Sequence, residues 1–287
     1  MAVLAFHDLP APAKLNAFLH VVDRRADGYH LLESAMLPID WCDVLHVERR
    51  ADGRLARHDL GEPLPPDDLC LRAARALQAA SGATFGADIS IDKRVPWGAG
   101  LGGGSSDAAT TLIALNRLWN LRWPRARLSE IGLSIGADVP FFLGRGAAFA
   151  EGVGERLTPF TVAPQWFAVV KPPTGLETAA IFRSPLLGRT DQPARIEGFT
   201  GGNGCAPWAF GRNDLQQAAE AACPEVAEAR AFLAARFGAA RMTGSGSAVF
   251  AWAGSGEEPT VAWPGVPRAG WAGRMCRSLA SHPLADW

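Results

Sequence analysis

The alternation of apolar and polar residues predicts strands in the first third of the chain. Lys14–Val22 is rich in β-forming residues that roughly alternate with polar ones, and a turn-forming segment, Arg25–Gly28, follows it. Val44–Glu48 and Ala87–Ile91 show similar short β-forming patterns. We therefore expect a strand that leads into a turn, and then two further strands.

Helical spacing of apolar residues predicts a helix between the last two of these strands, over about residues 67–80. Asp67 or Asp68 would cap its N-terminus, and Gly82 follows shortly after its end. A shorter helix is predicted near Leu128–Ser134. Helices thus alternate irregularly with strands.

The composition changes near Thr158, where prolines cluster and a new strand, Trp166–Val170, begins. We place a domain boundary there, which gives domains of residues 1–157 and 158–287. The second half adds a glycine-rich loop, a long alanine-rich helix and a strand pair, at residues 199–211, 215–237 and 240–252. Strands and helices mixed in both halves predict an α+β fold rather than a regular βαβ alternation.

Composition and charge narrow the class of protein. The chain has 287 residues, of which 48% are hydrophobic and 20% are charged, enough to bury a core in one large domain or two modest ones. The 28 basic residues almost balance the 29 acidic ones, giving a net charge of −1. Because no global positive field results, we expect neither nucleic acid nor an anionic membrane as a partner.

The five cysteines are widely spaced, without a C-x-x-C pair or a Cys/His cluster of metal-ligand spacing. Reduced thiols in a cytoplasmic protein are the simplest interpretation. The first residues contain no basic segment before an apolar run, which argues against a signal peptide. The apolar stretches elsewhere are too short to span a bilayer. We therefore expect a cytoplasmic protein.

A glycine-rich loop carries the strongest chemical signal. Val95–Asp107 follows a predicted strand and opens directly into an apolar helical pattern at Ser105–Trp119. Glycines allow successive N–H groups to turn inward, and the first helical turn leaves its own N–H groups unpaired, so both can bind a polyphosphate. A flexible linker is the alternative, but the Ser-Ser-Asp sequence that follows predicts helix capping instead. The P-loop lysine is absent, so another phosphate-binding fold is implied.

Four segments in order resemble the motifs of the GHMP kinases. Pro96–Ala109, with its Gly-Leu-Gly-Gly-Gly-Ser-Ser core, resembles their nucleotide-binding motif, and Met242–Ala248 resembles their third motif. Gly136–Phe142 resembles the segment with the catalytic aspartate. Pro12–Asn16, followed by Arg25–His30, resembles the N-terminal signature of the diphosphocytidyl-methylerythritol kinases, a branch that serves the non-mevalonate route to isoprenoids. The match spans about residues 10 to 252.

The resemblance implies a two-domain GHMP kinase fold with a ribosomal-protein-like N-terminal domain for ATP binding and catalysis, and a ferredoxin-like C-terminal domain for the substrate. It implies ATP and Mg²⁺ as cofactors. No metal ligand is assigned, and Ser105 is only a candidate. The residues expected to bind ATP are Pro96, Trp97, Gly98, Ala99, Gly100, Leu101, Gly102, Gly103, Gly104, Ser105 and Ser106.

By the same resemblance, Asp138 would accept the proton of the substrate hydroxyl, and Lys14 would hydrogen-bond Asp138 and stabilise the developing charge. Taken alone, Asp138 would more often be a turn or capping residue and Lys14 a surface lysine. Asn16, Tyr29 and His30 are expected near the cytidine of the acceptor, and Phe182 is expected to stack on its cytosine. Gly244 and Gly246 would let the third motif approach the substrate phosphates or the region of the active-site lysine.

The resemblance implies transfer of the ATP γ-phosphate to the 2-hydroxyl of the cytidine diphosphate derivative of methylerythritol. Another GHMP kinase, acting on homoserine, mevalonate or a sugar, is the first alternative. An idle nucleotide-binding protein and a ribosomal-type nucleic-acid module are further alternatives; the first would have lost Lys14 or Asp138, and the second predicts a basic face. One departure from the family is Gly254–Pro267, a Pro/Gly-rich stretch where a helix is usual.

Overall fold

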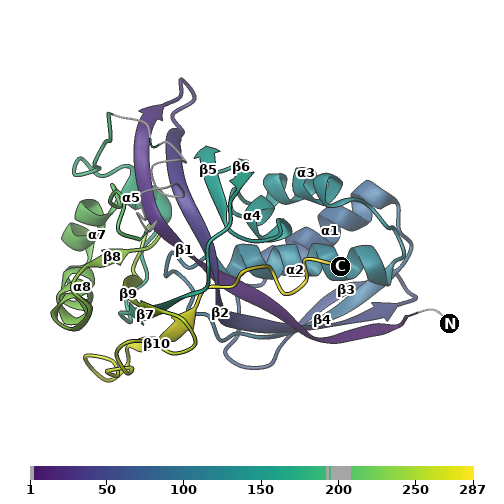
Figure 1. The fold of residues 1–287 in the computed structure, drawn as a ribbon. Coiled ribbons are helices and arrows are strands. Elements are labelled where there is room, and N and C mark those ends of the chain that lie inside the picture. Colours follow the sequence, from purple (N-terminus) through teal and green to yellow (C-terminus); the bar gives the residue numbers. More distant parts are fainter. Residues whose placement is uncertain (1–2, 192–193, 195–207) are drawn as a thin grey trace.

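Two β-sheets with helices packed against them form the structure, which is a computed structural model (Figure 1). It describes residues 3–191, 194 and 208–287. The six-stranded sheet has the order β3-β4-β2-β5-β6, with β1 paired to β2, and the four-stranded sheet has the order β10-β7-β9-β8. The predicted α+β class is confirmed.

The first sheet is built on a long antiparallel hairpin, in which residues 25–29 turn between β1 and β2. Its strands are β1 (Ala5–Arg24), β2 (His30–Arg50), β3 (Leu55–Asp59), β4 (Gly86–Asp92), β5 (Ala148–Gly152) and β6 (Arg156–Pro159). Both strands of the hairpin are longer than predicted. β1 contains Pro10 and Pro12, and it tolerates them because β2 is its only partner among the named strands.

Helices pack on the first sheet and close its core. They are α1 (Leu69–Ser81), α2 (Gly103–Leu118), α3 (Arg125–Ile135) and α4 (Val139–Leu143). The predicted ends of α1 are confirmed, since the Asp68 side chain accepts a hydrogen bond from Leu71 N at 3.0 Å and Gly82 takes a left-handed conformation with φ of 65°. Nearly all of α2 is buried, so it forms the centre of this half.

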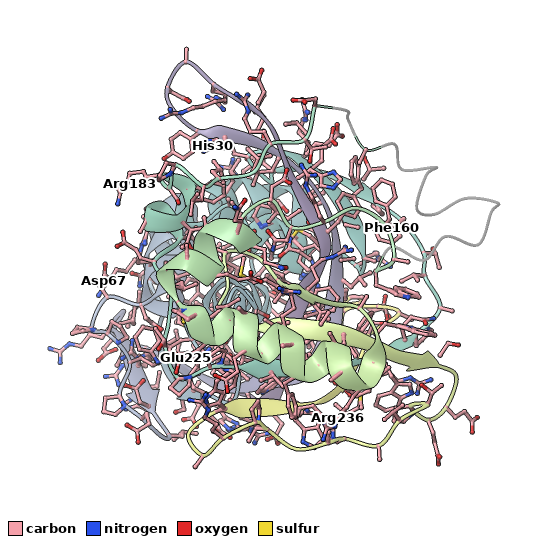
Figure 2. The ribbon with its side chains drawn as sticks, turned by 90° about the vertical axis from the view of Figure 1, so that its left-hand side faces the viewer. His30, Asp67, Phe160, Arg183, Glu225 and Arg236 are labelled. Carbon is pink, nitrogen blue, oxygen red and sulfur yellow. The ribbon has the colours of Figure 1, made fainter. Side chains whose placement is uncertain are left out.

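The second half places helices over the four-stranded sheet (Figures 1 and 2). Its elements are β7 (Gln165–Lys171), α5 (Thr178–Phe182), α7 (Gln216–Ala222), α8 (Pro224–Phe237), β8 (Ala240–Met242), β9 (Val249–Ser255) and β10 (Ala272–Arg277). The prediction of one helix over residues 215–237 is wrong. The helix breaks at Cys223, because Pro224 lacks an N–H and starts a new helix.

The two sheets share a buried cluster in which Leu15 and Leu37 of the hairpin pack with Phe167 and Phe250 of the second sheet. The C-terminal tail then returns to the first half, where Leu284 joins the core. Residues 256–271 contain no helix, as their prolines and glycines predict. The glycine-rich loop predicted at 199–211 lies mostly outside the described residues. The boundary at residue 157 stays a prediction.

In the described part of the chain, every helix is too short or too polar to span a lipid bilayer. The four cysteines that are described, Cys42, Cys70, Cys223 and Cys276, are free thiols.

Candidate active site

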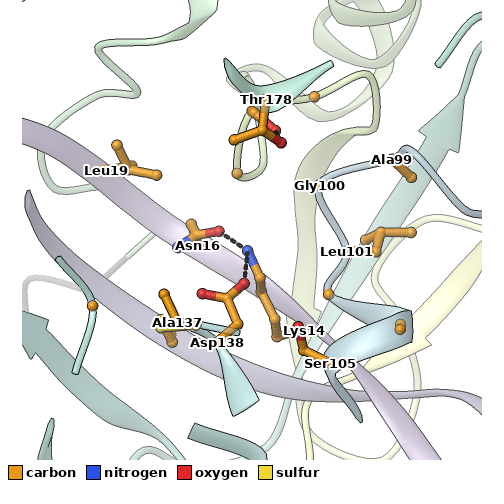
Figure 3. A pocket seen from close by; sticks show the side chains of 18 of the residues that line it. Lys14, Asn16, Leu19, Ala99, Gly100, Leu101, Ser105, Ala137, Asp138 and Thr178 are labelled. Carbon is orange, nitrogen blue, oxygen red and sulfur yellow. Dashed lines mark hydrogen bonds and ion pairs between the residues drawn. The ribbon is translucent and has the colours of Figure 1, made fainter. Parts of the chain in front are cut away.

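A cavity of about 600 Å³ lies between the hairpin, the glycine loop and the start of α4 (Figure 3). The predicted site residues that line it are Lys14, Asn16, Pro96, Trp97, Gly98, Ala99, Gly100, Leu101, Gly102, Gly103, Gly104, Ser105, Asp138, Phe182, Gly244 and Gly246. Ser106 is buried in α2 and does not line the cavity. The fold thus gathers segments that are more than two hundred residues apart in sequence around one space.

Lys14 and Asp138 face each other inside this cavity, with Lys14 Nζ 3.7 Å from Asp138 Oδ2. The Lys14 side chain is 3% exposed and that of Asp138 is 38% exposed, so the lysine forms the floor and the carboxylate faces the space. Burial lowers the pKa of the Lys14 ammonium from its ordinary value, and the charge of Asp138 opposes that shift. Asp138 precedes α4 without a capping hydrogen bond, so its carboxylate is free for other contacts.

Asn16 fixes the lysine from the other side. Its side-chain oxygen accepts a hydrogen bond from Lys14 Nζ, and its amide donates to Ser34 Oγ at 2.7 Å. The backbone N–H of Asn16 donates to Thr243 Oγ1 at 2.9 Å, which ties β1 to the third motif. Because these groups are buried, the Lys14 side chain has a defined position before any ligand binds.

The glycine loop is held by backbone hydrogen bonds to elements on both sides. Lys14 N donates to Leu101 O at 2.9 Å, and Ala248 N donates to Ala99 O at 3.0 Å. The N-cap of α2 is Gly102, with φ of 72° and no side-chain cap, so the prediction that Ser-Ser-Asp caps this helix is wrong. Because no side chain caps α2, the N–H groups of its first turn are available to bind an anion.

Gly100 and Gly244 let the glycine loop and the third motif touch backbone to backbone. A Cβ added at Gly100 would lie 2.2 Å from Thr243 O, and one at Gly244 would lie 2.7 Å from Gly100 O. Both residues also have positive φ, of 72° and 55°. No other residue type fits at this contact without moving one of the two loops.

We expect Gly100→Ala to cost more than the about 1–2 kcal/mol that a left-handed backbone alone would cost, because the new methyl group also meets a carbonyl oxygen. Denaturant unfolding measures the free energy of unfolding. Gly82→Ala is the matched control, since Gly82 has φ of 65° but no atom within 4 Å of an added Cβ. Equal losses in the two variants would show that the loops can move apart freely.

A second cavity of about 1180 Å³ continues from the first. Both are lined by Leu32, Ala137, Val153, Thr178 and Phe182. The rings of His30 and Phe182 stack in this second space, with centroids 5.3 Å apart and an angle of 20° between the planes. Burial and the charges of Arg24 and Arg189 lower the pKa of His30, which favours a neutral ring.

Tyr29 also lines the second cavity, but its side chain is 66% exposed at the hairpin tip. Figure 2 shows His30 and Arg183 at the same end of the molecule. The predicted acceptor residues therefore divide, with Asn16, Gly244 and Gly246 in the first cavity, Tyr29 and His30 in the second, and Phe182 shared by both. The second cavity offers flat aromatic faces next to the lysine–aspartate pair.

Sequence reasoning missed several polar residues of this region. Thr178 Oγ1 and Ser245 Oγ are hydrogen-bonded at 2.8 Å and join α5 to the third motif. Ser34 holds Asn16, and its own hydroxyl donates to Phe18 O at 2.6 Å. The Ser245 position lies inside the third motif and could have been found there, and Thr178 lies four residues before the predicted Phe182. Nothing in the sequence around Ser34 indicates a role.

Family models match both halves of the chain. The model described as "GHMP kinases N terminal domain" matches residues 68–146, which include the glycine loop and Asp138. The model described as "GHMP kinases C terminal" matches residues 206–265, which include the third motif.

Relatives and solved structures agree with these models. The chain is 60% identical, over its whole length and 99% of the relative, to a 4-diphosphocytidyl-2-C-methyl-D-erythritol kinase of Methylibium petroleiphilum. It is 55% identical to the kinase of the same name from Verminephrobacter eiseniae, with 99% of this chain and 98% of the relative covered.

A crystal structure of a 4-(cytidine 5'-diphospho)-2C-methyl-D-erythritol kinase superposes with a TM-score of 0.73 and 38% identity, over 86% of this chain and 90% of that one. A homoserine kinase from Cytophaga hutchinsonii has a TM-score of 0.71 at 14% identity, over 98% of this chain and 96% of that one, and shares the fold alone. The chain belongs to the GHMP kinase family, within its 4-diphosphocytidyl-2-C-methyl-D-erythritol kinase branch.

Proposed function

We propose that this kinase transfers the γ-phosphate of ATP to the 2-hydroxyl of 4-diphosphocytidyl-2-C-methyl-D-erythritol, in the non-mevalonate route to isoprenoid precursors. The observation that carries the proposal is the Lys14–Asp138 pair, which lies between a glycine loop suited to phosphates and a cavity with stacked aromatic rings. The names of the relatives, at up to 60% identity, support this substrate over other acceptors.

Asp138 is proposed as the base for the acceptor hydroxyl. Its carboxylate faces the cavity, and no helix-capping bond competes for it. As the acceptor oxygen forms a bond to the γ-phosphorus, the bond from that phosphorus to the bridging oxygen breaks, and the hydroxyl proton moves to Asp138. ADP then leaves with the former bridging oxygen on its β-phosphate, and the acceptor keeps the γ-phosphoryl group as a new phosphate ester.

Lys14 is proposed to hold both Asp138 and the phosphoryl group that is being transferred. Its ammonium is buried and fixed by Asn16, so it can stabilise developing negative charge without reorganising. Because burial lowers its pKa, turnover should decline with rising pH before the ordinary lysine value of 10.5 is reached. Turnover falls as the pH rises because the active form of Lys14 is the charged ammonium, which loses its proton at high pH.

The ATP phosphates are proposed to bind the glycine loop and the first turn of α2, where backbone N–H groups are available. Among the described residues, no group of three or more His, Cys, Asp or Glu side chains could hold a metal by itself. That fits Mg²⁺, which keeps waters and uses substrate phosphates with few protein ligands. Bound there with Ser105 as a neighbour, it would offset the charge of the β- and γ-phosphates.

The cytosine of the acceptor is proposed to bind in the second cavity against Phe182, with His30 and Tyr29 around it. A neutral His30 can both donate and accept a hydrogen bond at the base edge. We further propose residues 1–157 as the ATP-binding and catalytic domain and 158–287 as the substrate domain. A free small-molecule acceptor, rather than nucleic acid or a membrane, and a cytoplasmic location complete the proposal.

Phe182→Leu should raise the KM for the acceptor about 10-fold and leave the KM for ATP unchanged, because base stacking on an aromatic ring is worth about 1–3 kcal/mol. Steady-state kinetics with each substrate varied in turn separates the two effects. Phe232→Leu on α8, which lines neither cavity, is the control. An unchanged acceptor KM in Phe182→Leu would remove this residue from the base site.

A coupled ADP-release assay tests the function, with the cytidine acceptor, mevalonate, homoserine and galactose supplied in parallel. Release with the cytidine acceptor alone is expected. ADP release with another acceptor would support the kinase activity but contradict the proposed substrate. ADP release with none of them would favour an idle nucleotide-binding protein.

A further inference from the structure

A buried cluster of three charged residues lies behind the glycine loop, outside the two cavities. Asp43 is in the middle of β2, Lys93 follows β4, and Asp107 is in the second turn of α2. Lys93 Nζ contacts Asp43 Oδ2 and lies 2.7 Å from Asp107 Oδ2. The side chains are 13%, 0% and 4% exposed for Lys93, Asp43 and Asp107, so this cluster is almost entirely shielded from solvent.

The cluster reaches both ends of the loop. At the entry, the backbone N–H groups of Arg94 and Val95 donate to Asp43 Oδ1 at 2.6 and 2.7 Å. At the exit, Asp107 belongs to the helix that the loop opens, and Lys93 joins the two carboxylates. The Lys93 ammonium therefore links the entry and the exit of the loop that lines the proposed nucleotide site.

Gly103 allows this closure. A Cβ at this position would lie 3.1 Å from Val95 Cγ1 and 3.3 Å from Lys93 Nζ. The first residue of α2 thus packs directly on the residues that enter the loop. The spacing between the entry strand and the N–H groups at the start of α2 is set by this contact and by the ion pairs.

The electrostatics favour a charged lysine. Burial alone would lower the pKa of Lys93, but attraction to Asp107 and Asp43 outweighs it and raises the pKa to about 12. Burial and the charge of Asp43 raise the pKa of Asp107 well above its ordinary value, and Asp107 Oδ1 has no hydrogen-bond partner. Asp43 accepts hydrogen bonds from two backbone N–H groups as well as from the Lys93 ammonium, whereas the Asp107 side chain accepts from the ammonium.

We propose that Asp43, Lys93 and Asp107 form an ionic clamp that positions the glycine loop for the ATP phosphates, which makes Asp43 the principal positioning residue for nucleotide binding. This rests on the proposed nucleotide site but not on the identity of the acceptor. The clamp touches no reacting atom and acts through the backbone of the loop.

Asp43→Asn tests the clamp, because an amide cannot accept from both backbone N–H groups and also pair with the Lys93 ammonium. We expect the Kd for Mg-ATP, measured by calorimetry without acceptor, to rise about 10-fold or more, because small displacements of positioning groups have effects of this size. In turnover, the KM for ATP should rise by a similar factor, with kcat at saturating ATP and the KM of the acceptor within about threefold.

Asp107→Asn should change the Kd for Mg-ATP by less than threefold, since its amide oxygen can still accept a hydrogen bond from Lys93. Asp59→Asn is the matched control. Asp59 also pairs with a buried cation, Arg57, at 2.7 Å and accepts a backbone N–H from Leu64 at 3.0 Å, but it lines neither cavity. It should lower stability without changing the Kd.

An unchanged Kd for Mg-ATP in folded Asp43→Asn would overturn the clamp, as would an equal rise in the KM values of both substrates. If Asp43→Asn does not fold, Lys93→Arg serves instead, because it keeps all charges and alters only the geometry; a normal Kd for Mg-ATP there would also overturn the proposal. Since the calorimetry needs no acceptor, a wild type that binds ATP but does not phosphorylate the cytidine acceptor would contradict the proposed substrate and leave the clamp standing.

Discussion

Asp138→Asn should lower kcat by about 10²–10⁴-fold, the range that general-base catalysis contributes, while the Kd for ATP changes little. An amide of the same shape cannot accept the hydroxyl proton. The fold should be preserved, because Asp138 makes no capping hydrogen bond at α4. Rapid-quench measurement of a single turnover separates the chemical step from product release.

Asp68→Asn is the matched control for this variant. Asp68 also precedes a helix, but it caps that helix through Leu71 N, and Asn caps helices about as well as Asp. Its turnover should equal that of the wild type. Wild-type turnover in Asp138→Asn as well would remove the carboxylate from the role of base.

Lys14→Met should lower kcat by about 10²–10³-fold, comparable to the loss of one preorganised donor at a developing charge. Methionine fills most of the buried volume of the lysine side chain, so the variant mainly removes the positive charge. Lys171→Met is the control, since Lys171 is also buried and its ammonium donates to Pro173 O at 2.9 Å outside the first cavity. A rise in KM alone for Lys14→Met would limit Lys14 to substrate binding.

Lys14 and Asp138 should also act as a unit. Because they face each other at 3.7 Å, the double variant is expected to be about as slow as the slower single variant, instead of showing the product of the two losses. Multiplicative losses would mean that the two groups serve separate steps.

Helices α1 and α2 could be predicted because their sequence patterns agree with their places in the fold. The apolar spacing after the glycine loop gives α2, and Asp68 and Gly82 delimit α1. β3 could not be predicted, because the strand has only five residues, includes Arg57 and Asp59, and lies half-buried at the edge of its sheet. Pro224 indicates the break between α7 and α8. The alanine-rich sequence on both sides of it nevertheless led to the prediction of one continuous helix.

The site residues that lie in recognisable motifs could be predicted from the sequence. The buried charged residues that support the site could not. Lys14 and Asp138 lie in segments that resemble family motifs, and the fold brings their charges together. Asp43 lies on β2 and Lys93 follows β4, 50 residues later in the sequence, and no periodicity links them. Asp107 was assigned to helix capping because Asp is common there, whereas its carboxylate in fact faces a buried lysine.

Phosphorus NMR of the product formed from ATP and 4-diphosphocytidyl-2-C-methyl-D-erythritol tests the central claim most directly. The 2-carbon bears a methyl group and no hydrogen, so an ester at its oxygen should give a new phosphomonoester signal without splitting by a carbinol proton, as ATP is converted to ADP. A monoester signal split by neighbouring protons would place the phosphate on another hydroxyl, and no new ester would contradict the proposed reaction.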